Sequence, residues 1–496
     1  MSSTEASLPE KPERVFDRED EWDALVAFAR DGGAQPRLGV VTGRLRQGKT
    51  FLLEALTRAL GGFYFGAQQV TQADALSRLA DELARYTNEP SSRHWRGWED
   101  AVDALLALGG RGAVPVVIDE FPHLVRQSPS LPSVLHSAFR SHDGGRSGQA
   151  RLLLSGSDLP LMRRVFSTAS PLRELAGLDL TVGPFDFRRA ARFWGIEDPA
   201  LALLVHAVVG GTPAYRRDYV CDDAPGDRQD FDAWVCRTVL DPRKPLFREA
   251  YHLLQEETDH VDRALCHSAL SAVASGCSTQ GQVADCLAAP LTDTARCLGL
   301  LVENGLLHSA PDAFRPHLIR LHVAEPLLAF EHVAVGPRRS ALEQQDAAGV
   351  WKRARPVFDS VVARSHFAQI CRDWVLGFAG PDVFGAHPVS AARGALPDPE
   401  HSGGRDVAAD VVVHGHGTGR EAALLSVGLA RWDEVMDTHH LEQLRSLLAL
   451  LADRGDDVTR ARPACYGGAG FTPALRAAEA EGHVVLVGLD RLYGHR

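Results

Sequence analysis

The chain lacks any long hydrophobic run, which argues against a membrane-spanning helix. Apolar stretches such as residues 201–205 end within a few residues, here at His206, far short of the roughly eighteen residues that a span requires. The first fourteen residues are polar and carry several charges. They therefore lack the apolar segment of a secretion signal, and we expect a cytoplasmic protein.

Cysteine is scarce, and basic residues are not in excess. The eight cysteines include no C-x-x-C pair, so the sequence predicts neither a zinc site nor a disulfide framework. The 53 Lys and Arg residues are outnumbered by 64 Asp and Glu, giving a net charge of −11. This balance argues against general affinity for nucleic acid but leaves room for a local basic patch. At 496 residues, the chain is long enough for about three domains.

Residues 43–50 fit the phosphate-binding pattern G-x-x-x-x-G-K-[ST]. The apolar residues 38–42 precede them as a predicted strand, and residues 51–60 follow with apolar side chains at helical spacing. In this context the loop amides and the helix N-terminus attract phosphate. We expect Lys49 to reach the β- and γ-phosphates and Thr50 to ligate Mg²⁺. The predicted loop ligands are Gly43, Arg44, Leu45, Arg46, Gln47, Gly48, Lys49 and Thr50.

A second apolar run, residues 113–118, ends in Asp119 and Glu120 about seventy residues after the loop. A buried parallel strand would place Asp119 beside the metal, while Glu120 would polarise the attacking water as general base. A third apolar strand, residues 151–154, leads to Ser155 and Ser157. Either hydroxyl could hydrogen-bond the water or the γ-phosphate, and an ordinary turn explains both serines about as well.

The middle of the chain reads as mostly helical from residue 187 to about 247, with a break at residues 210–213. The pattern that follows predicts three short helices and two wing strands, which is winged-helix spacing. Arg296 is the one basic residue of the third helix, which favours packing against protein over DNA readout. The predicted helices span 261–274, 280–287 and 292–303, and the strands include 305–307 and 318–321.

The last part of the chain reads as a separate α/β domain. Residues 338–351 are polar, follow a Gly-Pro pair and predict a linker. Residues 391–405 carry Gly, Pro and His and predict a mobile loop. The predicted helices are 357–376 and 441–452, and the predicted strands are 407–414, 422–429 and 483–489.

Together these motifs resemble the archaeal-type ATPases of the STAND branch of the AAA+ group, in the subset with a winged helix and a C-terminal nuclease-like domain. Residues 15–19, Val-Phe-Asp-Arg-Glu, are similar to the opening F-x-[DGN]-R-E motif, which implies that Arg18 lies near the nucleotide base. Residues 210–215 resemble G-G-x-P-x-Y, which implies that Pro213 faces the nucleotide. Residues 154–157 match the sensor strand, and on this match Ser155 senses the γ-phosphate.

Two departures from the family pattern limit what the resemblance implies. After residues 170–172 the family commonly has a Gly-Arg pair, but this chain continues with Arg173-Glu174-Leu175. Arg173, or the pair at residues 163–164, could supply a cation to the transition state, and the arginine finger stays unassigned.

The second departure concerns the nuclease motif PD-(D/E)-x-K. Asp410 matches its first acid, but the E-x-K position reads Ser426-Val427-Gly428, and Gln369 stands where related chains often have a glutamate. One carboxylate cannot hold a catalytic metal alone, and Glu421 is a weak replacement. We expect a domain that keeps the fold and has lost cleavage.

The sequence thus predicts an α/β protein built on a P-loop NTPase parallel sheet, with a helical lid, a winged-helix domain and a restriction-endonuclease-like domain. The predicted boundaries are 1–186, 187–257, 258–335 and 352–496. We expect an ATPase that binds ATP and Mg²⁺ and couples hydrolysis to domain rearrangement. A slow STAND-type nucleotide switch in regulation or defence, and a DNA-binding ATPase, are the alternatives. A protein partner or homo-oligomer is expected, DNA has weaker support, and no membrane partner is expected.

Overall fold

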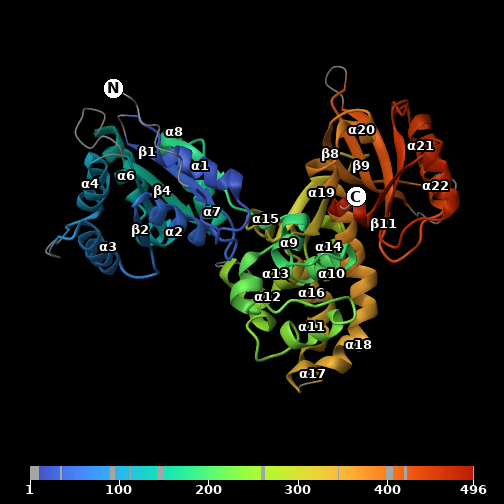
Figure 1. Cartoon of the computed structure of the whole chain (residues 1–496), viewed down its shortest axis with the longest axis horizontal. Helices are drawn as coiled ribbons and strands as arrows, with labels where there is room; N and C mark the ends of the chain where they lie inside the picture. The colour runs from blue at the N-terminus through green and yellow to red at the C-terminus, as the bar shows by residue number, and fades with distance from the viewer. Residues whose placement is uncertain are drawn as a thin grey trace. The chain divides into compact units, whose positions relative to one another are not determined.

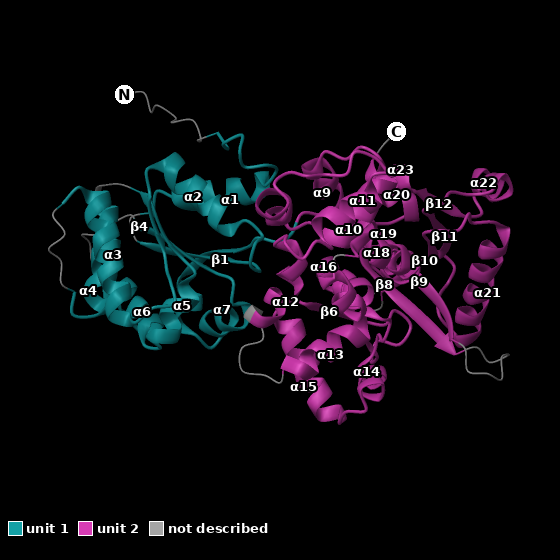
Figure 2. Cartoon of the chain, turned by 90° about the horizontal axis from the view of Figure 1, so that it is seen from below, with its two compact units in different colours: residues 1–184 teal, residues 185–496 magenta. Residues whose placement is uncertain are grey.

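The computed structural model describes residues 10–33, 36–89, 95–111, 113–141, 150–257, 263–344, 346–397, 406–417 and 422–494. The chain forms two compact units, Met1–Pro184 and Phe185–Arg496 (Figure 2). This division is coarser than the predicted four domains, whose boundaries stay a prediction. Within the described ranges, no helix combines the length and the apolar character needed to cross a membrane.

The first unit is built on a five-stranded sheet in the order β2-β3-β4-β1-β5, in which all neighbouring strands run parallel. The predicted α/β fold with a P-loop-type parallel sheet is therefore confirmed for this unit. The fifth strand was also predicted, at residues 178–182. In the structure this strand begins two residues earlier, at Ala176. The strands are β1 (Arg37–Thr42), β2 (Phe63–Gly66), β3 (Val114–Asp119), β4 (Ala150–Gly156) and β5 (Ala176–Thr181).

Helices cover both faces of this sheet, because its central strands are apolar on both sides. Side chains of α1 and α2 pack with Val41, Val117 and Leu153 on one face. Those of α3 to α6 pack with Leu38, Leu152 and other residues of the opposite face. Figure 2 shows these helices and the pair α1 and α2 on the two sides of the sheet. The helices are α1 (Glu19–Ala29), α2 (Lys49–Leu60), α3 (Gln72–Thr87), α4 (Trp98–Ala107), α5 (Phe121–Gln127), α6 (Leu131–Ser141), α7 (Leu159–Val165) and α8 (Pro171–Leu175).

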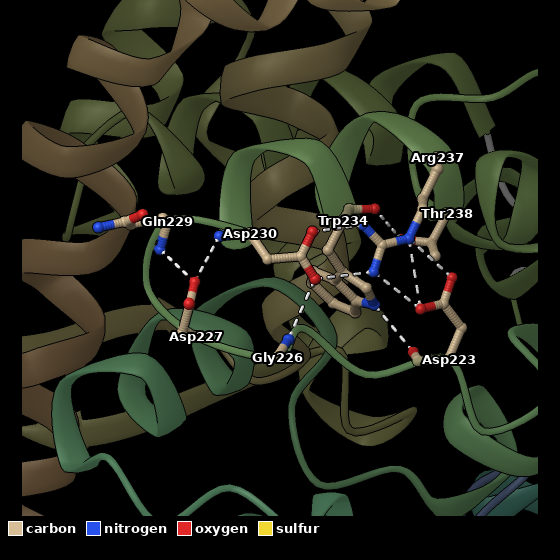
Figure 3. Close-up of polar contacts among 8 residues, drawn as sticks. All are labelled: Asp223, Gly226, Asp227, Gln229, Asp230, Trp234, Arg237 and Thr238. Atoms are coloured by element: carbon tan, nitrogen blue, oxygen red, sulfur yellow. Dashed lines mark hydrogen bonds and ion pairs between the residues drawn. The ribbon is translucent and has the colours of Figure 1, made fainter.

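The second unit begins with helices, as predicted for the lid. They are α9 (Phe187–Trp194), α10 (Pro199–Val209), the π-helix Tyr215–Tyr219, α11 (Phe231–Thr238) and α12 (Leu246–Glu257). The loop before α11 is held by ion pairs (Figure 3): the Arg237 guanidinium donates to the carboxylates of Asp223 and Asp230. The Trp234 indole also donates to the Asp223 carbonyl oxygen. This loop is thus fixed by side chains rather than by strand pairing.

Three helices and a hairpin follow, in agreement with the predicted elements. The helices are α13 (Arg263–Ala274), α14 (Gln280–Leu287) and α15 (Leu291–Glu303), and the antiparallel strands are β6 (Leu307–Pro311) and β7 (Ile319–Val323). The first of these helices was predicted to begin at residue 261, and residues 261 and 262 lie outside the described residues.

The linker predicted at 338–351 is wrong, because most of this stretch is helical. Asp346 caps the helix that begins at Ala347 by accepting a hydrogen bond from the Gly349 amide at 3.0 Å, and Trp351 is buried against Phe330 and Phe358. The elements here are α16 (Pro326–Phe330), the π-helix Glu331–Val335, the short turn Gly336–Arg338, α17 (Arg339–Glu343), α18 (Ala347–Val357), the π-helix Phe358–Ala363 and α19 (Arg364–Gly377).

The C-terminal sheet has the order β12-β11-β10-β9-β8. The predicted mobile loop at 391–405 is wrong for residues 391–397, which belong to β8, and residues 398–405 lie outside the described residues. The sequence also missed β11. The elements are α20 (Pro381–Phe384), β8 (Pro388–Pro397), β9 (Asp406–Gly415), β10 (Ala423–Arg431), α21 (Thr438–Arg454), β11 (Arg462–Gly467), α22 (Pro473–Ala480), β12 (Val485–Gly488) and α23 (Leu489–Tyr493), many of which are labelled in Figure 1.

A partly buried histidine pair joins α10 to α19 in the second unit. Nδ1 of His206 lies 2.7 Å from Nε2 of His366. Burial lowers the pKa of His206 to about 4 and the pKa of His366 well below its ordinary value. Both rings are therefore neutral at pH 7, and one donates to the other.

We expect the stability of this unit to fall as the pH decreases from 6.5 to about 4. In that window the unfolded chain takes up protons at both histidines and the folded chain does not, so each contributes a slope of about 1.4 kcal/mol per pH unit. Urea unfolding at pH 7 and pH 5 would measure the slope. His206→Leu should reduce it, whereas His439→Gln, at an exposed position, should leave it unchanged. An unaltered slope in His206→Leu would contradict this assignment.

Candidate phosphate and metal site

The loop between β1 and α2 has the backbone geometry of an anion cradle. Gly43 and Gly48 have φ values of 156° and 92°, and Arg46 has a φ of 66°. The Gln47 side-chain oxygen accepts a hydrogen bond from the Arg44 amide at 2.9 Å and so fixes the turn. The loop leads directly into α2, whose N-terminus carries the partial positive charge of the helix dipole.

Gly43 cannot be replaced without a clash. A Cβ atom at this position would lie 2.1 Å from the Val182 carbonyl oxygen, next to the end of β5. We expect Gly43→Ala to lower the free energy of unfolding by about 3 kcal/mol and to weaken nucleotide binding by displacing the loop. Gly61→Ala is the matched control, because Gly61 also has a positive φ but its Cβ would meet open space. Equal losses in both variants, measured by chemical denaturation, would show that the clash is not the cause.

Lys49 lies folded over the loop. Its Nζ atom donates to the carbonyl oxygens of Gly43, at 2.7 Å, and Arg44, at 3.0 Å, and the residue is buried. A phosphate held by the loop amides would therefore lie beside an ammonium that the protein already positions there. This supports the role predicted for Lys49.

Thr50 and Asp119 meet at the carboxyl edge of the sheet. The Thr50 hydroxyl donates to Oδ2 of Asp119 at 2.6 Å, and Asp119 is almost completely buried. A hydroxyl and a carboxylate in contact at a phosphate loop form the hard oxygen donor set that Mg²⁺ prefers. The residues present therefore fit the predicted metal.

Tyr64 is a third member of this cluster, and the sequence analysis missed it. Its hydroxyl donates to the same Asp119 Oδ2 atom at 2.8 Å. Burial and the Asp119 charge raise the pKa of Tyr64 well above its ordinary value, so the phenol stays a donor at neutral pH. The sequence does show one hydroxyl side chain in the otherwise apolar strand β2. That this strand lies beside β3, which carries Asp119, is known only from the sheet order.

Glu120 follows Asp119 in a left-handed conformation, with a φ of 51°. Its Oε2 atom accepts hydrogen bonds from the Ser157 hydroxyl at 2.7 Å and the Ser157 amide at 3.3 Å. Ser155 is fully buried, and its hydroxyl has no hydrogen-bond partner within the described ranges. The structure thus brings Ser157 to the predicted base, while γ-phosphate sensing by Ser155 stays a prediction.

Arg18 connects the loop to the segment after β5. Its Nη2 atom donates to the carbonyl oxygens of Gln47, at 3.2 Å, and Gly183, at 2.5 Å, and its Nη1 atom pairs with Glu21 at 2.7 Å. Arg18 therefore stabilises the phosphate loop, although it lies outside the G-x-x-x-x-G-K-[ST] pattern. Contact with a nucleotide base stays a prediction.

Other predicted groups lie outside this cluster. Pro213 belongs to the second unit, so its place beside the nucleotide also stays a prediction. Arg173 forms a surface ion pair with Asp179 at 2.5 Å, and Arg163 and Arg164 lie in the last turn of α7. None of these contacts assigns an arginine finger.

Asp410, which the sequence analysis matched to the first acid of the nuclease motif, pairs with an arginine. Oδ2 of Asp410 accepts from Nη1 of Arg431 at 2.9 Å and from the Ala430 amide at 3.0 Å. Gln369 accepts from Arg372, which also donates to the Asp410 carbonyl oxygen. Within the described ranges, no group of three or more His, Cys, Asp or Glu residues could hold a metal ion. Glu421 lies outside those ranges.

Comparison with known proteins gave structural neighbours only. No protein-family model and no curated protein matches the chain. A Walker-type ATPase of Pyrococcus abyssi is 19% identical, with a TM-score of 0.48, over 65% of this chain and 98% of its own. The Aeropyrum pernix ORC2 protein, solved as ADPNP and ADP complexes, is 17% identical, with a TM-score of 0.40, over 69% and 97%.

The Aeropyrum pernix ORC1 protein, solved with DNA, is 16% identical, with a TM-score of 0.32, over 67% of this chain and 95% of its own. Likeness at this level is too distant to assign a function. Any functional argument therefore depends on the geometry of the loop and of the strand ends.

Proposed function

We propose that the chain is a Mg²⁺-dependent ATPase whose nucleotide cycle drives rearrangement of its second unit. The observation that supports this most directly is the 2.6 Å contact between the Thr50 hydroxyl and Asp119 at the phosphate loop. An acid tandem after a buried strand, beside a glycine loop and a lysine, is the set of groups that phosphoryl transfer requires.

Each group has a defined task in this proposal. The loop amides and Lys49 hold the phosphates, while Thr50 and Asp119 hold the metal. When bound, Mg²⁺ neutralises charge on the phosphate oxygens. Glu120 accepts a proton from the attacking water, and Ser157 orients its carboxylate. Catalysis of this kind consists of positioning and electrostatic stabilisation.

The second unit would receive the nucleotide signal. Helices α13 to α15 and the β6–β7 hairpin have the element order of a winged helix. The C-terminal sheet combines antiparallel pairing of β8, β9 and β10 with parallel pairing of β10, β11 and β12. The Arg431–Asp410 ion pair supports loss of cleavage, because a cation already neutralises the carboxylate that a catalytic metal would need.

A slow nucleotide switch is the second candidate, and the Ser157–Glu120 contact favours it. Oε2 of Glu120 already accepts two hydrogen bonds from Ser157, so its lone pairs are occupied before a water approaches, which suits slow turnover. Phosphate-release assays with and without protein partners or DNA would separate the two functions. Turnover that a partner stimulates supports an ATPase cycle, whereas tight ADP retention supports the switch. A binding titration against salt would test for DNA, since phosphate contacts impose a steep slope.

A further inference from the structure

Asp119 receives three hydrogen bonds from three different places in the fold. Oδ2 accepts from the Thr50 hydroxyl on α2 and from the Tyr64 hydroxyl on β2. Oδ1 accepts from the Glu120 amide at 3.0 Å. Strand β2 pairs with β3 so that Gly66 lies opposite Asp119 and Tyr64 lies opposite Val117, and the tyrosine side chain therefore reaches along the strand to the carboxylate.

The two carboxylate oxygens of Asp119 therefore differ in the number of hydrogen bonds that they accept. Oδ2 already has two hydroxyl donors, whereas Oδ1 has one backbone donor among the described contacts. A hydroxyl that ligates a metal through its oxygen can still donate its proton, so the Thr50 bond to Oδ2 is compatible with a bound ion. The Tyr64 bond fixes the rotation of the carboxylate about its Cβ–Cγ axis, and with it the positions of both oxygens beside Thr50.

We propose that Tyr64 is a positioning residue for the metal, and that it sets the affinity for Mg²⁺ by orienting Asp119. The inference rests on the proposed function, because it requires a divalent cation at Thr50 and Asp119. In this proposal Tyr64 acts through Asp119 and is not itself a ligand of the metal or the phosphate. Outer-shell hydrogen bonds to metal ligands typically change metal affinity by about 10- to 100-fold, and we expect an effect in this range.

Tyr64→Phe removes only the hydroxyl and keeps the ring in the sheet. Tyr86→Phe is the matched control: its hydroxyl also donates a hydrogen bond, to the Gly61 carbonyl oxygen at 2.8 Å, and its ring contacts Phe63 next to Tyr64. Two readouts are needed. Calorimetry with ADP in EDTA measures metal-free nucleotide binding, and electron paramagnetic resonance measures Mn²⁺ binding to the ADP-saturated protein.

We expect all three proteins to bind ADP equally in EDTA, while Tyr64→Phe binds Mn²⁺ at least tenfold more weakly than the wild type and Tyr86→Phe. Mn²⁺ affinity within twofold of the wild type in Tyr64→Phe overturns the role of Tyr64 and leaves the proposed function intact. Weakening of ADP binding in EDTA to the same extent as Mn²⁺ binding also overturns it, since the effect would be structural. A wild type that binds ADP but no Mn²⁺ overturns both proposals.

Discussion

Lys49→Ala should lower the affinity for ATP roughly 100-fold, because it removes the buried cation that lies beside the phosphates in the proposed function. Truncating one partner of a buried charge pair costs about 3 kcal/mol, which corresponds to that change in affinity. The ammonium is already placed over the loop by the Gly43 and Arg44 carbonyl oxygens. Its loss therefore removes positive charge at the site without a large rearrangement of the sheet.

The matched control for Lys49 is Arg58→Ala on the same helix. Arg58 pairs with Glu54 on the exposed side of α2, where such pairs contribute little, so ATP affinity should stay within twofold of the wild type. Calorimetric titration of each folded variant provides the comparison. Equal ATP affinities for Lys49→Ala and the wild type would mean that the loop does not bind phosphate.

Glu120→Gln should abolish most turnover while leaving nucleotide binding intact. The amide keeps the shape of the side chain and can still accept the Ser157 hydrogen bonds, but it cannot take a proton from water. General base catalysis contributes roughly 10²- to 10⁴-fold, and phosphate release should fall by this amount. ATP affinity should change by less than about twofold, since Glu120 carries no predicted contact to the phosphates.

Glu82→Gln on α3 is the control for this change, since Glu82 pairs with Arg85 on an exposed surface. It should retain wild-type phosphate release. Equal rates of ATP hydrolysis in Glu120→Gln and Glu82→Gln would show that Glu120 is not the general base. If both of these rates were also low, the slow-switch function would gain support.

The phosphate loop could be predicted from sequence because its signal is local. A strand, a glycine-rich turn and a helix follow one another in 23 residues, Leu38–Leu60, and each element begins within a residue or two of its predicted place. The Asp119–Glu120 tandem was also recognisable, because a buried strand ends there. The phosphate loop and the acid tandem can both be recognised within a short stretch of sequence, without knowing which strands are neighbours in the sheet.

Tyr64 was not predicted, and Ser157 was named only as one of two serines that could bond the water or the γ-phosphate, because their contacts depend on which strands are neighbours. The sheet order places β2 and β4 on either side of β3, so Tyr64 reaches Asp119 and Ser157 reaches Glu120 from opposite sides. The helical stretch after residue 338 was missed for a related reason. Its polar sequence resembles a linker, and the buried contacts of Trp351 come from residues distant in the chain.

The most direct test of a P-loop nucleotide site is calorimetric titration of ADP and ATP, with Mg²⁺, into the pure folded chain. We predict saturable binding of one nucleotide per chain, weakened roughly 100-fold in Lys49→Ala and retained in Glu120→Gln. No detectable binding of either nucleotide at millimolar concentration would contradict the function proposed for this chain.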